Sequence, residues 1–172
     1  MSFIYTLSVH SGTFTDSHGA VMPPIYATST FAQPAPGQHT GYEYSRSGNP
    51  TRHALETAIA DLENGTRGYA FASGLAAIST VLELLDKDSH LVAVDDVYGG
   101  TYRLLENVRR RSAGLQVSWV KPDDLAGIEA AICPDTRMIW VETPTNPLLK
   151  LADLSAIAAI ARRHNLISVA DN

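Results

Sequence analysis

Residues 71–75, Phe-Ala-Ser-Gly-Leu, have the residue types of a phosphate-binding turn between a strand and a helix. Backbone N–H groups at a helix N-terminus, with the helix dipole behind them, favour an anion such as phosphate. Gly74 would let the backbone approach that ligand closely. Alternatively, Ser73 only caps the helix and Gly74 only makes the turn. Both interpretations stay open for this segment alone. The sequence contains neither GxGxxG nor GxxxxGK[ST], which argues against a nicotinamide-binding Rossmann domain.

Tyr98 and Asp171 are two further residues that could contact a ligand. Tyr98 follows an apolar run and precedes two glycines, which permit close packing of a flat ligand on which the ring could stack. A tyrosine that simply packs in a turn is the alternative. Asp171 ends an apolar strand-like run, where a buried carboxylate needs a cationic or hydrogen-donating partner. Asp95 and Asp96 can be ordinary strand-end caps.

Two loop segments carry polar side chains that name no reaction by themselves. Glu142 and Asn146 flank a Thr-Pro-Thr turn, whose prolines indicate a rigid loop. Tyr44 and Arg46 lie in an irregular stretch. An arginine there suits bidentate binding of phosphate or carboxylate, but a lone surface arginine is usually just solvated.

Composition and charge exclude several functional classes. The chain has 172 residues and a formal net charge of −5, which argues against binding to nucleic acid. Its six histidines show no spacing of three or four residues and no HExxH motif, so no metal site is predicted. The single cysteine, Cys133, lacks a neighbouring base and fits a packing role in a reducing compartment. No signal peptide or membrane span is visible, so we expect a cytoplasmic protein.

Residues 1–50 differ from the rest of the chain. They contain five of the nine prolines and five of the twelve glycines, and they show no sustained helical or strand period. Such a segment cannot bury a core alone. It is either a flexible leader or an arm that lies on another surface, and its aromatic residues favour the arm.

From Asn49 onward, helical and strand-like patterns alternate. The patterns predict helices at 50–62, 74–85, 100–111, 125–132 and 153–164, and strands at 68–72, 90–94, 115–120, 138–142 and 166–171. This alternation predicts an α/β fold with a mainly parallel sheet and helices on both faces. Ligands of open α/β sheets bind beyond the carboxyl ends of the strands, which is where the residues described above lie.

Five segments together carry a resemblance to a known family. They are YEYSRSGNPTR (42–52), AFASGLAA (70–77), DDVYGGTYR (95–103), ETPTNP (142–147) and VADN (169–172). In order and spacing they resemble the Cys/Met-metabolism family of pyridoxal 5'-phosphate (PLP) enzymes. Its γ-lyase branch looks most similar, its γ-synthase branch very close and its β-lyase branch less so. The resemblance implies fold type I, the aspartate-aminotransferase-like architecture, with 1–50 as an arm on a neighbouring subunit and 51–172 as the first part of the PLP-binding domain.

The resemblance also implies roles for the residues singled out above. Ser73, Gly74 and Leu75 would hold the cofactor phosphate. Tyr98 would stack on the cofactor ring and act as an acid or base, while Asp171 would pair with the protonated ring nitrogen. Two further pairs complete the expectation: Tyr44 and Arg46 at the phosphate of the neighbouring subunit, and Glu142 and Asn146 at the substrate end.

The implied activity is the carbon–sulfur lyase step of transsulfuration, which converts L-cystathionine to L-cysteine, 2-oxobutanoate and ammonia, in a homotetramer built from dimers with shared active sites. The alternatives are γ-synthesis from an O-acyl-homoserine and L-cysteine, or a truncated, non-catalytic half. PLP enzymes need a Schiff-base lysine, and Lys87, Lys121 and Lys150 all lie outside the family's context for it. We therefore expect an N-terminal portion that is inactive without the remainder, which could be a separate chain.

Overall fold

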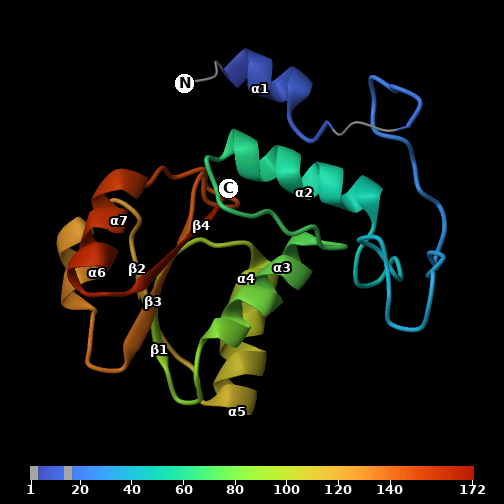
Figure 1. Cartoon of the computed structure of the whole chain (residues 1–172). Coiled ribbons are helices and arrows are strands. Elements are labelled where there is room, and N and C mark those ends of the chain that lie inside the picture. Colours follow the sequence, from blue (N-terminus) through green and yellow to red (C-terminus); the bar gives the residue numbers. More distant parts are fainter. Residues whose placement is uncertain (1–3, 14–16) are drawn as a thin grey trace. The chain divides into compact units, whose positions relative to one another are not determined.

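The computed structural model describes residues 4–13 and 17–172 and divides into two units, 1–72 and 73–172 (Figure 1). The division falls after the helix that begins at Pro50, and contact of an arm with a neighbouring subunit stays a prediction. No helix in the described ranges combines the length and apolar character needed to cross a bilayer. The elements, in chain order, are α1 (Ile4–His10), α2 (Pro50–Leu62), α3 (Gly74–Val81), η1 (Leu82–Leu84), β1 (His90–Val94), α4 (Gly99–Arg103), η2 (Leu104–Arg109), α5 (Arg110–Ala113), β2 (Gln116–Val120), α6 (Leu125–Ala130), β3 (Thr136–Glu142), α7 (Leu154–Arg163) and β4 (Ile167–Asp171).

Two helices organise the first unit. Helix α2 begins where the sequence predicts, because Asn49 Oδ1 accepts a hydrogen bond from Thr51 N–H at 2.8 Å and Pro50 occupies the first turn. Residues 1–50 show no sustained helical period in the sequence, yet the structure contains the short helix α1 within them. Its chain then passes close to α2, since a Cβ added to Gly12 would lie 2.2 Å from the carbonyl oxygen of Ala54. Helix α1 also contacts α2, and a helix of seven residues is too short to be evident from sequence.

The segment between these helices doubles back on itself. Phe31 N–H donates to Glu43 O at 3.0 Å, and Ser45 N–H donates to Ser29 O at 2.8 Å. The ring centres of Phe31 and Tyr42 lie 5.5 Å apart. The aromatic residues of this segment thus contact one another within the first unit.

The strand predicted at 68–72 is wrong. In the structure this stretch follows helix α2, and a Cβ added to Gly68 would lie 2.1 Å from the carbonyl oxygen of Glu56. The amide of Ala70 donates to Glu56 Oε1 at 2.9 Å. A backbone N–H that would bond to a neighbouring strand is thus bonded to a side chain of α2. A strand needs a neighbouring strand, and the described part of the chain provides none beside this stretch.

The second unit contains a four-stranded sheet in the order β2-β1-β3-β4. All pairs are parallel, as predicted, with Val92 opposite Ser118 on β2 and Ile139 on β3. The central strands β1 and β3 are buried almost throughout, which explains why they are continuous apolar runs in the sequence. Figure 1 shows α6 and α7 on one side of this sheet and α3, α4 and α5 on the other. The fold class predicted from the alternating pattern is confirmed.

The strand order reverses direction between β1 and β3. The chain runs from β1 outward to β2 and then crosses back to β3 on the other side of β1. Connections that leave in opposite directions open a crevice at the carboxyl ends of the two strands, where ligands bind in such sheets. The segments that follow β1 and β3 are therefore the expected walls of a site.

Candidate active site

A cleft of about 710 Å³ opens at the carboxyl ends of β1, β3 and β4. Seven of the predicted site residues line it: Ser73, Gly74, Leu75, Tyr98, Glu142, Asn146 and Asp171. They come from four separate stretches of the sequence and all belong to the second unit. Tyr44 and Arg46 belong to the first unit, which is described by itself. The sheet topology thus brings together most of the residues that the motifs singled out.

The beginning of helix α3 forms one wall of the cleft. Ser73 Oγ accepts a hydrogen bond from Ala76 N–H at 3.2 Å, so this serine does cap the helix. The N–H groups of Gly74 and Leu75 precede the first helical hydrogen bonds and have no partner within the helix. A Cβ added to Gly74 would meet no atom within 4 Å. Open space therefore lies beside backbone donors at a helix N-terminus, an arrangement that suits an anion.

Tyr98 is held by its backbone while its side chain remains accessible. Its N–H donates to Glu142 Oε2 at 2.8 Å. A Cβ added to Gly100 would lie 2.3 Å from Tyr98 Cε1. The Tyr98 ring therefore occupies space that a side chain at position 100 would fill. The residue is still 47% exposed, which leaves the ring available to stack on a ligand.

Glu142 is a buried carboxylate whose hydrogen bond fixes the Tyr98 turn. Burial raises the pKa of Glu142, and the negative charges of Asp171 and Asp96 raise it further, whereas the Tyr98 N–H bond acts in the opposite direction. The sequence indicated only that Glu142 flanks a turn. Its contact with Tyr98 depends on the pairing of β1 with β3 and has no signal in either motif.

Asp171 is the second carboxylate of the cleft and differs in its partners. It ends β4 directly opposite Glu142 on β3. Burial raises the pKa of Asp171, and within the described residues its carboxylate has neither an ion pair nor a hydrogen bond. A half-buried carboxylate without a donor is suited to a cationic N–H group of a ligand.

The loop after β3 carries Asn146 into the cleft and is closed by hydrogen bonds of Thr145. Thr145 N–H donates to Lys150 O at 2.9 Å, and Lys150 N–H donates to Thr145 Oγ1 at 2.9 Å. Lys150 Nζ forms an ion pair with Asp95 Oδ1 at 3.0 Å. Lys150 is not among the residues that line the cleft.

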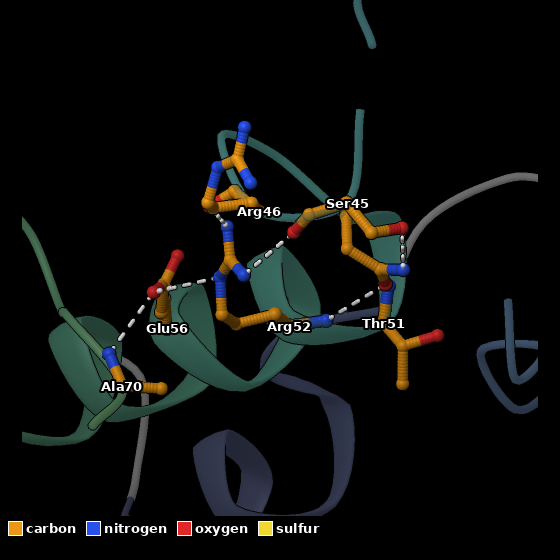
Figure 2. Close-up of polar contacts among 7 residues, drawn as sticks. Ser45, Arg46, Thr51, Arg52, Glu56 and Ala70 are labelled. Atoms are coloured by element: carbon orange, nitrogen blue, oxygen red, sulfur yellow. Dashed lines mark hydrogen bonds and ion pairs between the residues drawn. The ribbon is translucent and has the colours of Figure 1, made fainter. Parts of the chain in front are cut away.

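Tyr44 and Arg46 lie on a turn that is fastened to helix α2. The Arg46 guanidinium lies 4.9 Å from the centre of the Tyr44 ring. Figure 2 shows Arg52 of α2 reaching back to this turn, where it donates to the carbonyl oxygens of Ser45 at 2.9 Å and Arg46 at 3.4 Å. Arg52 also contacts Glu56 Oε1 at 3.6 Å. The motif at 42–52 thus contains two arginines with different positions. Arg52 holds the turn by hydrogen bonds, and Arg46 lies on the turn itself.

Comparison with known proteins identifies the family. A family model described as Cys/Met metabolism PLP-dependent enzyme matches residues 5–172. The chain therefore belongs to this family, whose members use PLP as their cofactor. The crystal structure of a cystathionine gamma-lyase from Lactobacillus plantarum complexed with L-serine is 49% identical in sequence, with a TM-score of 0.93 over 99% of this chain and 45% of that chain. Fold type I is thereby confirmed.

Two curated relatives carry different activity names. A protein of Coxiella burnetii named cystathionine beta-lyase is 56% identical over 99% of this chain and 44% of its own length. A protein of Bacillus subtilis named cystathionine gamma-lyase is 49% identical over 97% of this chain and 44% of its own length. The expectation that the β-lyase branch is less similar is therefore not supported. The chain spans about half the length of the curated relatives it matches.

Proposed function

We propose that this chain forms the cofactor-binding part of a PLP-dependent carbon–sulfur lyase that acts on L-cystathionine. The proposal rests chiefly on the cleft at the carboxyl ends of β1, β3 and β4, which gathers an anion-binding turn, an accessible aromatic ring and an unpaired carboxylate. PLP, when bound, supplies a cationic ring that accepts electrons from the reacting carbon of an amino acid. The residues of the cleft fit the charges and shape of that group.

The phosphate end of the cofactor is assigned to the start of α3. The amides of Gly74 and Leu75 would donate to phosphate oxygens, and the Ser73 hydroxyl adds a third donor without leaving its cap position. The absence of any atom within 4 Å of an added Cβ at Gly74 supports this assignment.

The ring end is assigned to Asp171 and Tyr98. The Asp171 carboxylate would accept a hydrogen bond from the ring N–H and hold the proton on that nitrogen, which keeps the ring cationic. Burial raises the pKa of Asp171, and a cationic neighbour would lower it. Tyr98 would stack on the ring, and its hydroxyl would donate a proton to the sulfur that departs.

Glu142 and Asn146 are assigned to the substrate end of the cleft. Glu142 would act there mainly by fixing the Tyr98 turn through its hydrogen bond with the backbone. Tyr44 and Arg46 are assigned to the cofactor phosphate of a neighbouring subunit, in a homotetramer built from dimers. An arginine that is held by a hydrogen-bonded turn is suited to that task because its main chain is already ordered.

Two bonds of L-cystathionine are candidates for cleavage. Breaking the Cγ–S bond with one water gives L-cysteine, 2-oxobutanoate and ammonia, and we favour this reaction from the motifs. Breaking the Cβ–S bond with one water gives homocysteine, pyruvate and ammonia. The second reaction is favoured by the relative named cystathionine beta-lyase, which is 56% identical.

The test is to identify the 2-oxo acid that the complete, PLP-loaded protein releases from L-cystathionine. 2-Oxobutanoate is the expected product, whereas pyruvate would assign the protein to β-elimination. Condensation of O-succinyl-homoserine with L-cysteine, without release from cystathionine, would assign it to synthesis. A complete protein that binds no PLP would overturn the whole proposal.

A matched pair of variants tests the role of the Tyr98 hydroxyl. Tyr98→Phe keeps the ring and loses the proton donor, so turnover should fall by about a hundredfold, as for loss of a general acid, with PLP content unchanged. Tyr102→Phe is the control, because Tyr102 packs on Trp119 with ring centres 5.4 Å apart and does not line the cleft. Equal activity of the Tyr98→Phe and Tyr102→Phe proteins would remove this role.

A further inference from the structure

We propose that Asp96 is a positioning residue, which fixes the loop that carries Asn146 against the end of strand β1. This inference deepens the proposed function and rests on it for its catalytic consequence. Asp96 is not among the residues that line the cleft. It would therefore act on the reaction only through the residues that it holds.

Three hydrogen bonds from the loop after β3 converge on Asp96. Its Oδ2 accepts from the Thr145 hydroxyl at 2.6 Å and from Leu148 N–H at 3.0 Å. Its backbone oxygen accepts from Asn146 N–H at 3.0 Å. Residues on both sides of Asn146, and Asn146 itself, are therefore tied to one residue that lies two positions before Tyr98.

The Asp96 carboxylate is also needed to satisfy a buried hydroxyl. Thr145 has no exposed surface, and its Oγ1 already accepts from Lys150 N–H at 2.9 Å. The hydroxyl hydrogen of Thr145 must then go to an acceptor, which Asp96 Oδ2 provides. Removal of that acceptor would leave a buried donor unsatisfied and would cost more than the hydrogen bond itself contributes.

The backbone of Asp96 adopts a conformation that suits this geometry. Its φ of +63° lies in the left-handed region, which aspartate and asparagine enter more readily than most other residues. From the sequence alone, Asp96 can be an ordinary strand-end cap. The left-handed turn, the side-chain acceptor and the backbone acceptor together indicate a more specific role in joining two loops of the site.

Three variants of the complete protein separate this role from general stability. Asp96→Ala removes the acceptor, and Asp96→Asn keeps one side-chain oxygen and a residue type that tolerates positive φ. Asp88→Ala is the matched control, because Asp88 has a φ of +62° and precedes the opposite, amino-terminal end of β1. Both alanine variants therefore carry the same backbone strain.

The first readout is hydrogen exchange of the Leu148 amide in the PLP-free protein. We expect exchange to be about tenfold faster in Asp96→Ala, and to stay within about threefold of the parent in Asp96→Asn and Asp88→Ala. The second readout is the KM for L-cystathionine of the PLP-loaded protein, which should rise about tenfold in Asp96→Ala alone.

Unchanged Leu148 exchange in Asp96→Ala would overturn the positioning role, whatever the activity. Faster Leu148 exchange in Asp88→Ala to the same extent would also overturn it, because the effect would then be one of general stability. Failure of the parent protein to bind PLP would instead overturn the proposed function, and the exchange measurement would still test Asp96.

Discussion

Asp171 and Glu142 lie opposite each other on adjacent strands, and both have a pKa raised by burial. The two carboxylates differ in their hydrogen-bond donors. Glu142 accepts the backbone N–H of Tyr98, whereas the carboxylate of Asp171 has no donor among the described residues. A charge that is partly desolvated and unpaired destabilises the fold that contains it. At the residue scale, this difference supports the proposal that Asp171 pairs with a cationic group of a ligand.

Asp171→Asn should raise the melting temperature of the PLP-free protein, because the variant no longer buries an unpaired charge. The same change should weaken PLP binding by about tenfold or more, since a charge-assisted hydrogen bond becomes a neutral one. Calorimetry and PLP titration measure the two effects. Asp123→Asn, at an exposed position, is the control and should change neither. A lower melting temperature in Asp171→Asn would show that the carboxylate supports the fold.

Gly100→Ala should displace the Tyr98 ring. The new Cβ would lie 2.3 Å from Tyr98 Cε1, and such overpacking costs about 1–3 kcal/mol. Gly99→Ala is the matched change in the same turn, where the nearest atom to the new Cβ is the end of the flexible Arg103 side chain at 3.2 Å. Denaturant titration should find Gly100→Ala the less stable of the two proteins, and equal stabilities would contradict the assigned ring position.

At the scale of elements, the N-terminus of α2 joins the helix to the arm. Asn49 Oδ1 caps the helix through Thr51 N–H at 2.8 Å. The amide nitrogen of the same side chain donates to Tyr26 O and Ser45 Oγ, both at 3.0 Å. The Asn49 side chain thus accepts a hydrogen bond from the helix through Oδ1 and donates hydrogen bonds to the irregular segment through Nδ2. An aspartate at this position could perform only the first of these tasks.

Two substitutions of Asn49 should separate the tasks. Asn49→Ala should destabilise the protein by about 1–2 kcal/mol through loss of the cap. Asn49→Asp keeps a capping oxygen, so helix content should be retained while proteolysis within residues 17–48 becomes faster. Circular dichroism and limited proteolysis measure the two effects. The donor role is refuted by equal proteolysis rates in the Asn49→Asp and parent proteins.

The sequence predicts the elements of the second unit because each has a local cause. Strands β1 and β3 are continuous apolar runs, and α7 has its cap at Asp153, whose Oδ1 accepts from Ala156 N–H. Where the prediction fails, the cause is a contact with a distant part of the chain. Helix α1 contacts α2, and Ala70 of residues 68–72 donates its N–H to Glu56 of α2 instead of to a strand. The bonds of Asp96 likewise depend on β1 and β3 being paired.

At the scale of the whole molecule, the two ends of the sheet respond to pH in opposite directions. At the end away from the cleft, His90 is bound by Thr136 Oγ1 at 2.7 Å and Ser118 Oγ at 2.9 Å. Burial lowers the pKa of His90, and the charge of Asp135 only partly opposes this. The unfolded chain therefore binds this proton more readily, and stability falls as pH drops through about 6.5, the ordinary histidine pKa.

His90→Gln should weaken the loss of stability on acidification. Glutamine can still hydrogen-bond to the two hydroxyls but does not titrate. The contributions of Glu142 and Asp171 to the pH dependence of stability have the opposite sign, because their raised pKa values make the folded state bind protons more readily. These contributions are the same in the parent and the His90→Gln proteins. Urea titrations between about pH 7 and pH 5.5 should therefore show a steeper decline for the parent protein. Parallel curves would mean that His90 contributes nothing.

The polar contacts that join the loops at this end of the sheet span long stretches of chain. Tyr98 and Glu142 are 44 positions apart, Asp96 and Thr145 are 49 apart, and Asp95 and Lys150 are 55 apart. None can form before the intervening β2 and α6 have been synthesised and the two central strands aligned. A nascent polypeptide would therefore form the cleft that we assign to vitamin B6 only after the ribosome has passed β3 and the loop that follows it.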